Sequence, residues 1–492
     1  MKTAPDPFAV TPGDQLAPKA DRVWRTRSVR EANAEAVWRL LRGLVFAILL
    51  IRASSDPIFN LLGGDSGGAS MGVGALFNVL AIAVAGILLL QAPLKAPFPV
   101  IAIWGPFLLI AFSSAFQAPD FNAAVRLASV LLTYWAFFAI PFFILRSSRD
   151  VLCFIEVVFA SSIPPTLYAF VDLAQGLSDL HDFRLESTFT HPNIYAFYLV
   201  LLLGLALYVR ASGIVRASPR IRMLVTLYIP LLVVLLLLTK TRSAWGACAL
   251  MLLVYAVRID RRFLAGLLLL PVLFIANPNL MDRLTDVTAS PEIDIFSQLN
   301  AETPLNSFNW RQALWESVLP HVLEQPLLGH GLETLRPSVP RFFPIVSPPG
   351  IDGHNLYLQM SFELGLLGLL ALLWLFGCVA WCLARGWRRD PPGILIISCL
   401  LVAYMLESYS DNMHFYLAFN WYFWFVMGTL CAGIRHDAHA TIARRSPDAR
   451  QGRAPAPDPQ EPHPAGKRLS ARVSRTAGRS LRRALLSRSL SQ

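Results

Sequence analysis

The chain alternates between long apolar runs and short polar connections. Twelve of these runs have roughly the length of a membrane-spanning helix, which is about 20 residues. They lie at 37–54, 71–91, 98–116, 123–145, 150–173, 192–210, 222–239, 243–257, 262–276, 355–384, 393–410 and 413–434. The pattern predicts an all-α, polytopic membrane protein with about twelve transmembrane helices.

One connection is much longer than the others. Residues 277–354 separate the first nine apolar segments from the last three, and loops of such length are usually functional or disordered. Within this loop, Trp310, Leu314, Val318 and Val322 recur at helical spacing. We expect an amphipathic helix that lies on the outer face, followed by a tight turn in the segment PLLGHG at 326–331.

Composition supports the membrane class and locates the charge. The chain is 55% hydrophobic and 15% charged, whereas soluble proteins carry about 25% charged residues. Most of the net charge of +11 lies in the tails, because residues 435–492 hold thirteen basic against four acidic residues and residues 1–42 hold eight against five. Basic tails beside a membrane body favour contact with anionic lipid over binding of nucleic acid.

The positive-inside rule predicts the orientation. With the N-terminus in the cytoplasm, the five short inner loops and their flanks hold thirteen Lys and Arg residues, and the five short outer loops hold four. We therefore expect a cytoplasmic tail at 1–36, nine helices within 37–276, an outer loop at 277–354, three helices within 355–434 and a disordered, basic cytoplasmic tail at 435–492. No cleavable signal peptide is expected, because the first 36 residues are polar.

No pattern of a metal or cofactor site is evident. The six cysteines all fall inside apolar segments, so we expect neither a disulfide nor a Cys-ligated metal. His191, His330 and His354 do not have a metal-binding spacing. A Walker loop and a GxSxG nucleophile elbow are also missing from the sequence.

Several cationic residues are predicted to lie at the outer face. Lys240 and Arg242 occupy a tight outer turn, where they either snorkel to the membrane interface or form an anion site with the N-terminus of the helix that follows. Arginine suits bidentate contact with phosphate. Arg126 lies within an apolar segment, about one turn from its outer end. It either reaches the lipid headgroups or belongs to a functional site.

His354 and Glu363 are polar residues at the start of an apolar run. His354 is either a residue that begins a helix or a general base near neutral pH. On a continuous helix Glu363 would lie about 13.5 Å deeper and on the opposite face, so the two cannot form one acid/base pair. We expect Glu363 to face the helix bundle, and Gly365 and Gly368 to let a neighbouring helix approach closely.

The order of these motifs resembles the O-antigen ligase and O-antigen polymerase superfamily. The resemblance covers roughly residues 120–375. It rests on Arg311, Trp315, PLLGHG, His354-Asn355, Glu363, Gly365 and Gly368, together with THPN at 190–193 and TRSAWG at 241–246. His330 departs from the pattern, because that turn position usually carries another residue type.

The resemblance implies a glycosyltransferase of the bacterial inner membrane that works on the periplasmic side without a metal or another cofactor. Its donor would be a glycan on undecaprenyl pyrophosphate, and its acceptor another glycan, lipid A–core sugar or protein. Carried across by motif, His354 is the general base. Arg242, Arg311, Arg126, Lys240, Asn193 and Asn355 are the substrate-binding residues, and Glu363, Gly365 and Gly368 are structural.

Two other classes of function remain open at this point. A secondary transporter or flippase of lipid-linked glycan would also be polytopic, although transporters favour paired repeats, and no internal repeat is evident. A non-catalytic partner in a membrane assembly is the other alternative. The sequence does not separate a ligase from a polymerase or a protein oligosaccharyltransferase.

Overall fold

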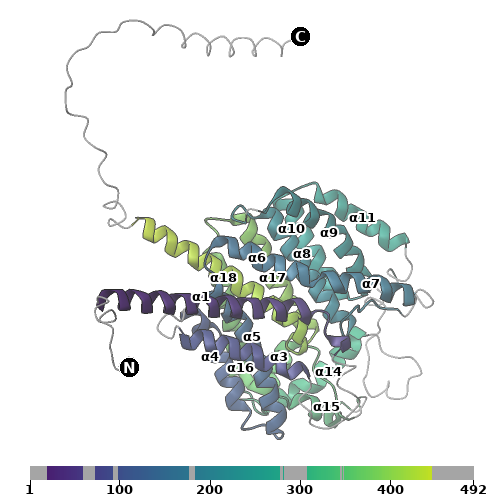
Figure 1. The fold of residues 1–492 in the computed structure, drawn as a ribbon. Coiled ribbons are helices and arrows are strands. Elements are labelled where there is room, and N and C mark those ends of the chain that lie inside the picture. The colour runs from purple at the N-terminus through teal and green to yellow at the C-terminus, as the bar shows by residue number, and fades with distance from the viewer. Residues whose placement is uncertain are drawn as a thin grey trace, which may run out of the picture. The chain divides into compact units, whose positions relative to one another are not determined.

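The computed structural model describes residues 19–58, 73–91, 98–176, 183–215, 217–276, 281, 307–343, 346 and 348–445, and every regular element in them is a helix (Figure 1). The all-α class is thus confirmed. The elements are α1 (Lys19–Arg52), α3 (Val73–Gln91), α4 (Phe98–Ser114), α5 (Phe121–Ile144), α6 (Ser148–Ser161), α7 (Ile163–Gly176), α8 (Pro192–Ala211), α9 (Pro219–Leu238), α10 (Arg242–Arg258), α11 (Phe263–Ala276), α14 (Ser307–Val322), α15 (Leu335–Phe342), α16 (Leu356–Ala384), α17 (Pro391–Ser410), the 3-10 helix η2 (Met413–Phe415) and α18 (Leu417–Arg445).

Each of the twelve predicted apolar segments falls on a helix, but not all are clear membrane spans. Among the described residues, seven helical stretches are long and apolar enough to cross a membrane. They are Phe121–Ile144, Arg149–Gly176, Pro192–Ala211, Pro219–Leu238, Leu356–Ala384, Pro391–Ser410 and Leu417–Asp437. The second stretch combines α6 and α7, which are interrupted at Ser162 just before a Pro-Pro pair. The count of twelve transmembrane helices therefore stays a prediction.

The predicted borders of the tails differ from the ends of the helices. Helix α1 begins at Lys19, inside the segment 1–36 that was expected to be a tail, and α18 continues to Arg445, past the expected border at 435. The chain divides into two units, Met1–Ala440 and Thr441–Gln492, and the structure describes only the end of α18 in the second. The remainder of the C-terminal tail and residues 282–306 of the long loop lie outside the described residues.

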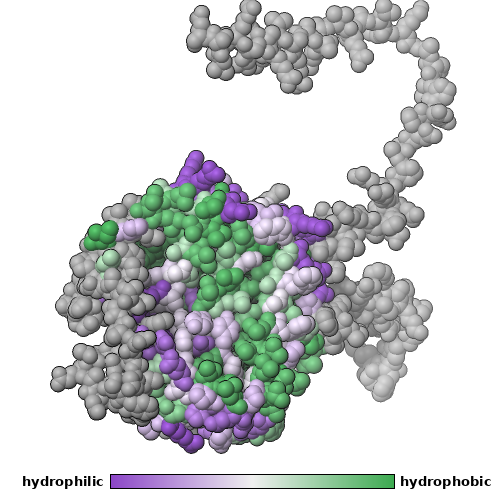
Figure 2. All heavy atoms as spheres, turned by 180° about the vertical axis from the view of Figure 1, so that it is seen from behind, coloured by the Kyte–Doolittle hydropathy of each residue, from purple (hydrophilic) through white to green (hydrophobic). Residues whose placement is uncertain are grey.

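Helices α8 and α18 form the centre of the first unit. Both are apolar around their whole circumference, and 89% of each membrane-length window is buried, as expected for helices surrounded by others. Helix α8 packs against α9, α10 and α17. Large apolar side chains such as Leu90, Leu109 and Leu268 are instead exposed on outer helices, and Figure 2 shows broad hydrophobic areas on one face. Such a surface suits contact with lipid.

Antiparallel helices α8 and α17 place two groups of loops at opposite ends. Helix α8 begins with Asn193 in its first turn and ends at the C-cap Ser212, and α17 returns from the N-cap Asp390 to the C-cap Asp411. At one end Ser212 Oγ donates to Asp390 Oδ2 at 2.6 Å, and at the other Asn193 Nδ2 donates to Asp411 Oδ2 at 2.7 Å. We refer to these as the Asp390 end and the Asp411 end.

Among the described residues, connections predicted to lie inside contribute to the Asp390 end, and three connections predicted to lie outside meet at the Asp411 end. Residues Val151, Ile214, Asp390 and Asp437 line one pocket at the former. At the Asp411 end, hydrogen bonds link the connections 183–193, 239–242 and 411–416. This segregation agrees with the predicted orientation, although which end faces the cytoplasm remains a prediction.

The long loop folds against α16 at the Asp411 end. Helix α14 covers the predicted amphipathic segment, and its buried residues Leu314 and Val318 pack with α15 and with Phe362 of α16. This small cluster consists of Ala313, Leu314, Val318, Leu335, Val339, Phe343 and Phe362. The buried side of α14 is therefore covered by protein, and the described part of the loop from residue 307 onward packs against α16 and carries Arg311 and His354.

Candidate active site

Asn355 and His354 form the beginning of α16 in different ways. Asn355 is the N-cap, because its Oδ1 accepts hydrogen bonds from the backbone N–H groups of Tyr357 and Leu358 at 3.0 and 3.1 Å. His354 precedes the cap with a left-handed φ of 44°, which is uncommon for residues other than glycine. The Asn355 oxygen is engaged in the cap.

The imidazole of His354 lies between two carboxylates. Its Nδ1 is 3.6 Å from Asp411 Oδ1, and its Nε2 is 3.5 Å from Asp352 Oδ1. The indole of Trp310 meets the ring edge-to-face, with 5.7 Å between ring centroids. Burial by itself lowers the pKa of His354, but the two carboxylates outweigh burial and hold the pKa above its usual value of 6.5.

Asp411 is a buried carboxylate that is fully engaged. Its Oδ1 accepts from the Tyr416 hydroxyl at 2.7 Å and from the Asn412 backbone N–H at 3.0 Å, while Oδ2 accepts from Asn193. Burial alone would raise the pKa of Asp411, but His354, Tyr416 and other partners lower it below 3.8. Asp411 is thus ionised at neutral pH and faces the imidazole across 3.6 Å, and the buried Nδ1 of His354 has no hydrogen-bond partner among the described residues. No prediction from the sequence singled out Asp411.

Asn193 connects the THPN and TRSAWG segments to Asp411. Besides its bond to Asp411, its Oδ1 accepts from Arg184 Nη2 at 2.8 Å and from Thr241 Oγ1 at 3.2 Å. Arg184 Nε also donates to the Thr239 carbonyl at 3.0 Å. Both ends of the Asn193 amide are thus bound to protein groups, one of which is Asp411, and a contact of Asn193 with substrate stays a prediction.

The predicted cations lie around this network in different positions. Lys240 occupies the turn before α10 with φ of 52°, and Arg242 is the first residue of α10, directly after Thr241. Arg311 on α14 is close enough to lower the pKa of both His354 and Asp411. The structure therefore brings Arg311 to the His354–Asp411 pair, and the α10 cations to the neighbouring network.

Arg126 belongs to a separate group of charges. It is exposed on α5 and acts on Glu333, which follows the PLLGHG segment. Burial raises the pKa of Glu333, and the charges of Arg336 and Arg126 partly offset this effect. The charge of Asp352 also acts on Glu333. The charges around Glu333 and the His354–Asp411 pair therefore share one neighbour, Asp352, which lies next to His354.

Glu363 fixes the long loop to α16. It is fully buried, and its Oε1 accepts from the Leu335 backbone N–H at 3.3 Å and from Gln359 Nε2. Gln359 in turn accepts from the Gly353 N–H at 2.9 Å, directly before His354. Glu363 therefore lies behind the pair and supports the segments on both sides of it.

The PLLGHG segment runs along the middle of α16 as an irregular ladder. The N–H groups of His330 and Gly331 donate to the carbonyls of Phe362 and Glu363 at 2.9 Å, and the Leu366 N–H donates to Pro326 O at 2.7 Å. These bonds use backbone groups that a regular helix would keep for itself.

Gly365 makes this ladder possible. Its φ is 63°, which kinks α16, and a Cβ there would overlap the Leu327 carbonyl of the loop. We had expected a neighbouring helix to approach at Gly365; the structure places a loop there instead. The atoms nearest to a Cβ at Gly368 belong to Leu364 of the same helix, and a close helix approach at Gly368 stays a prediction.

A family model described as O-antigen ligase matches residues 227–373. The matched region, about a third of the chain, is therefore similar to an O-antigen ligase domain, and we refer to it by that name. It confirms the resemblance over this part of the chain, which includes TRSAWG, α14, PLLGHG, His354 and the kink of α16. No curated protein matches the chain.

The O-antigen ligase domain does not contain the whole candidate site. Asn193 precedes residue 227, and Asp411 and Tyr416 follow residue 373. The His354 ring is thus supplied by the domain, whereas the carboxylate behind its Nδ1 is supplied from outside it. Sequence motifs within the domain could not have revealed this partner.

His330, the residue that departs from the ligase pattern, has contacts within the long loop. Its Nε2 is 2.8 Å from the His321 carbonyl, and its ring stacks on Phe362 with 4.4 Å between centroids. These contacts fix the PLLGHG segment on α16. His191 likewise has a local contact, because its Nδ1 accepts from the Asn193 N–H at 3.1 Å and caps α8.

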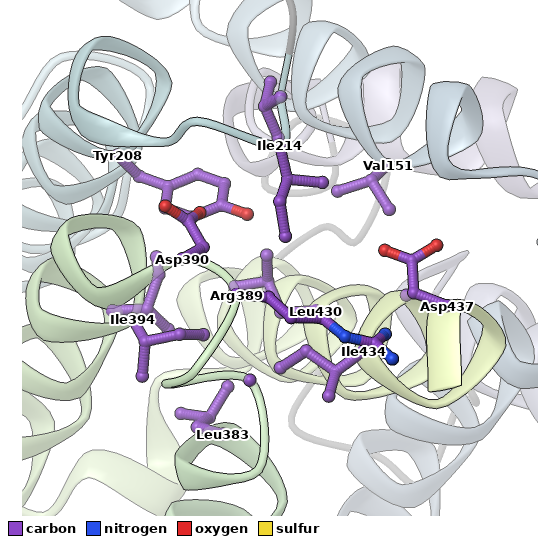
Figure 3. Close-up of a pocket in the computed structure, with 14 residues that line it drawn as sticks. Val151, Tyr208, Ile214, Leu383, Arg389, Asp390, Ile394, Leu430, Ile434 and Asp437 are labelled. Carbon is purple, nitrogen blue, oxygen red and sulfur yellow. The ribbon is translucent and has the colours of Figure 1, made fainter. Parts of the chain in front are cut away.

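A small pocket at the Asp390 end is separate from the candidate site of the ligase domain. It has a volume of about 30 Å³ and is lined by Tyr208, Ile214, Arg389, Asp390 and Asp437, among others (Figure 3). Its volume is about that of one water molecule, which is too small for a sugar. Within the described parts of the chain, no group of three or more His, Cys, Asp or Glu residues could hold a metal ion.

Proposed function

We propose that the protein transfers a glycan from an undecaprenyl-pyrophosphate carrier to a sugar hydroxyl, as an O-antigen ligase or a polysaccharide polymerase. The observation that carries the proposal is the His354 imidazole held against the buried Asp411 carboxylate, inside and beside an O-antigen ligase domain. Such a pair is suited to take a proton from a hydroxyl near neutral pH. The packed loop brings Arg311 to the same place.

In the proposed reaction His354 acts as the general base. Asp411 faces Nδ1, so Nε2 is the nitrogen that takes the proton of the acceptor hydroxyl. The hydroxyl oxygen attacks the anomeric carbon as the bond from that carbon to the pyrophosphate oxygen breaks, and the configuration inverts. The carrier leaves as a pyrophosphate. Asp352, near Nε2 and partly exposed, offers a route for the proton to solvent.

The cations stabilise the leaving group in this proposal. Arg311 is placed to contact the pyrophosphate, and Arg242 and Lys240 extend the cationic surface at the start of α10. Fixed positive charge near a developing anion lowers the barrier without a metal ion. Arg126 is proposed as a contact to glycan. Asn193 and Asn355, whose oxygens are bound to protein groups, are proposed to position Asp411 and α16.

The proposed setting is the bacterial inner membrane. The seven candidate spans and the ligase domain support a membrane protein that handles lipid-linked glycan. We place the Asp411 end in the periplasm and both termini in the cytoplasm, because the basic short loops gather at the Asp390 end. The acceptor is then lipid A–core sugar or another lipid-linked glycan.

Complementation of a deletion strain tests the proposal. Wild-type protein should restore long surface polysaccharide, whereas His354→Ala, expressed at the same level, should restore none. His436→Ala is the matched control, because His436 lies on α18 at the Asp390 end, and it should behave as wild type.

The outcome also separates the alternatives. Normal polysaccharide from His354→Ala would refute the base assignment. A deletion that strands long chains on the carrier lipid indicates a ligase, and one that leaves single repeats on the acceptor indicates a polymerase. If the purified protein moves labelled lipid-linked glycan across vesicle membranes without transferring it, the protein is a flippase.

A further inference from the structure

Glu333 is a strained residue beside the proposed site. It follows the PLLGHG segment and adopts a φ of 61°, a left-handed conformation that glycine or asparagine adopts more easily than glutamate. Unfavourable backbone conformations of this kind persist where the surroundings over-determine them, and they gather at functional sites. Both the backbone conformation and the side-chain contacts of Glu333 bear on its role.

Neighbouring contacts hold the Glu333 backbone in this conformation. Gly331 N–H donates to Glu363 O at 2.9 Å, and Leu335 N–H donates to the buried Glu363 Oε1 at 3.3 Å. Between them, Thr334 Oγ1 donates to Gly331 O at 2.5 Å. On the other side, a Cβ on Gly331 would come within 2.8 Å of Ala118 Cα. The segment is fixed on both sides, so Glu333 has little freedom to relax.

One oxygen of the Glu333 carboxylate is left unsatisfied by the described residues. Its Oε2 is buried and has no hydrogen-bond partner among the residues that the structure describes. A buried carboxylate oxygen without a donor is costly, and such groups are rare in folded proteins. The surrounding charged groups are Arg336 and Arg126 of positive sign, and Asp352, Asp120 and the buried carboxyl group of Glu363 on the acidic side. This mixture does not neutralise Glu333 through a direct ion pair.

We propose that Glu333 binds the acceptor sugar, accepting hydrogen bonds from hydroxyls next to the one that reacts. The inference rests on the proposed function. An ionised carboxylate is an acceptor with two oxygens, and neighbouring sugar hydroxyls supply two donors at matching spacing. Arg126 and Arg336 can donate to sugar oxygens on either side. In this proposal the bound sugar supplies the hydrogen-bond donors that the protein does not provide to Glu333.

The position of Glu333 also fits the direction of the reaction. Asp352 acts on Glu333 and lies 3.5 Å from His354 Nε2, the nitrogen that takes the proton. Arg311 acts on Asp411, and Thr241, which lies between Lys240 and Arg242 in the chain, bonds to Asn193. The acceptor would approach His354 from the side of α5 and α15, and the pyrophosphate would lie on the side of α10 and α14. Displacement at the anomeric carbon requires such separation of entering and leaving groups.

A transfer assay with purified protein in lipid vesicles tests the inference. The probes are the lipid-linked glycan and the acceptor lipid extracted from the deletion strain, in which both accumulate. In Glu333→Gln we expect the KM for acceptor to rise about tenfold, as for the loss of one charge-assisted hydrogen bond. The KM for donor and kcat should remain within about twofold. Glu324→Gln, on an exposed residue of the same loop, is the control and should match wild type.

Glu333→Gly separates binding from structure. Glycine removes the carboxylate and also relieves the left-handed strain, so the acceptor KM should rise while the thermal midpoint does not fall. A lower midpoint with both KM values altered would indicate a structural role and overturn the inference. An unchanged acceptor KM in Glu333→Gln, with active wild type, would overturn this inference alone. Absence of transfer by wild-type protein would overturn the proposed function itself.

Discussion

His354 is placed so that its charge state depends on two acidic neighbours. Asp411 faces one ring nitrogen and Asp352 faces the other, and Arg311 opposes them with positive charge. A buried carboxylate behind an imidazole fixes the ring and its tautomer and stabilises the imidazolium that forms when it takes a proton. The same carboxylates keep the His354 pKa above 6.5 in spite of burial. The base must lose this proton before it can act.

The pH dependence of Asp411→Asn follows from this arrangement. In wild-type protein the transfer rate should rise with pH to a midpoint above 6.5, as His354 becomes neutral. Removing the Asp411 charge lowers the His354 pKa, so the acid limb of the profile should move to lower pH. The maximum rate should nevertheless fall at least about tenfold, because the ring loses its fixed orientation. Initial rates measured between about pH 5 and 9, which spans the range in which histidine titrates, give the position of the acid limb and the maximum rate.

Asp260→Asn is the control for that measurement. Asp260 Oδ2 lies 3.5 Å from Nη2 of Arg210, a residue of α8 near the Asp390 end. Asp260 does not contact the candidate site. Its profile should overlay that of wild type. An acid limb that stays in place in Asp411→Asn would mean that Asp411 does not act on the titrating group.

Only part of this residue pattern could be predicted from the sequence. His354 and Arg311 stand out because they are polar residues in a recognisable order. Asp411 stands out less, because nothing in SYSDNMHF distinguishes it from other polar residues in a short connection. Its burial and its contact with His354 arise from the packing of α16 and α17, which local sequence does not encode. Glu333 escaped notice for the same reason.

At the scale of elements, the segments were predictable and their irregularities were not. The run 355–384 is apolar and lacks proline, so it predicts one continuous helix. The structure has a kink at Gly365, where backbone groups of α16 bond to the PLLGHG loop. A single glycine in an apolar helix has many possible uses, and only its φ of 63° distinguishes a kink from a packing position.

Gly365→Ala should destabilise the docked loop. Alanine is strained at this φ, and its Cβ would overlap the Leu327 carbonyl, which can move only if the ladder breaks. We expect a loss of roughly 2–4 kcal/mol, seen as a lower thermal midpoint in detergent, together with faster proteolysis of 307–343. Gly377→Ala lies in the same helix, where a Cβ meets nothing within 4 Å, and should be neutral. Equal midpoints for the two variants would show that the kink does not hold the loop.

At the scale of the molecule, the distribution of charge links the fold to the proposed function. Basic residues of the short loops gather at the Asp390 end, and the candidate site lies at the Asp411 end. Helices α8 and α17 join the ends through Ser212–Asp390 and Asn193–Asp411 contacts. The sequence predicts this separation because the positive-inside rule acts on loops near each span. It does not determine how many helices cross the membrane, since short apolar segments and broken helices satisfy the same hydropathy.

Cysteine accessibility in intact cells tests which end is periplasmic. In a background with the six native cysteines replaced, Glu316→Cys on α14 and Arg388→Cys between α16 and α17 introduce single exposed thiols at the two ends. A membrane-impermeant maleimide should label only Glu316→Cys in spheroplasts and both after permeabilisation. The reverse pattern would place His354 on the cytoplasmic side. In that case the acceptor hydroxyl would lie in the cytoplasm, and transfer onto a periplasmic glycan would be impossible whatever the chemistry of the pair.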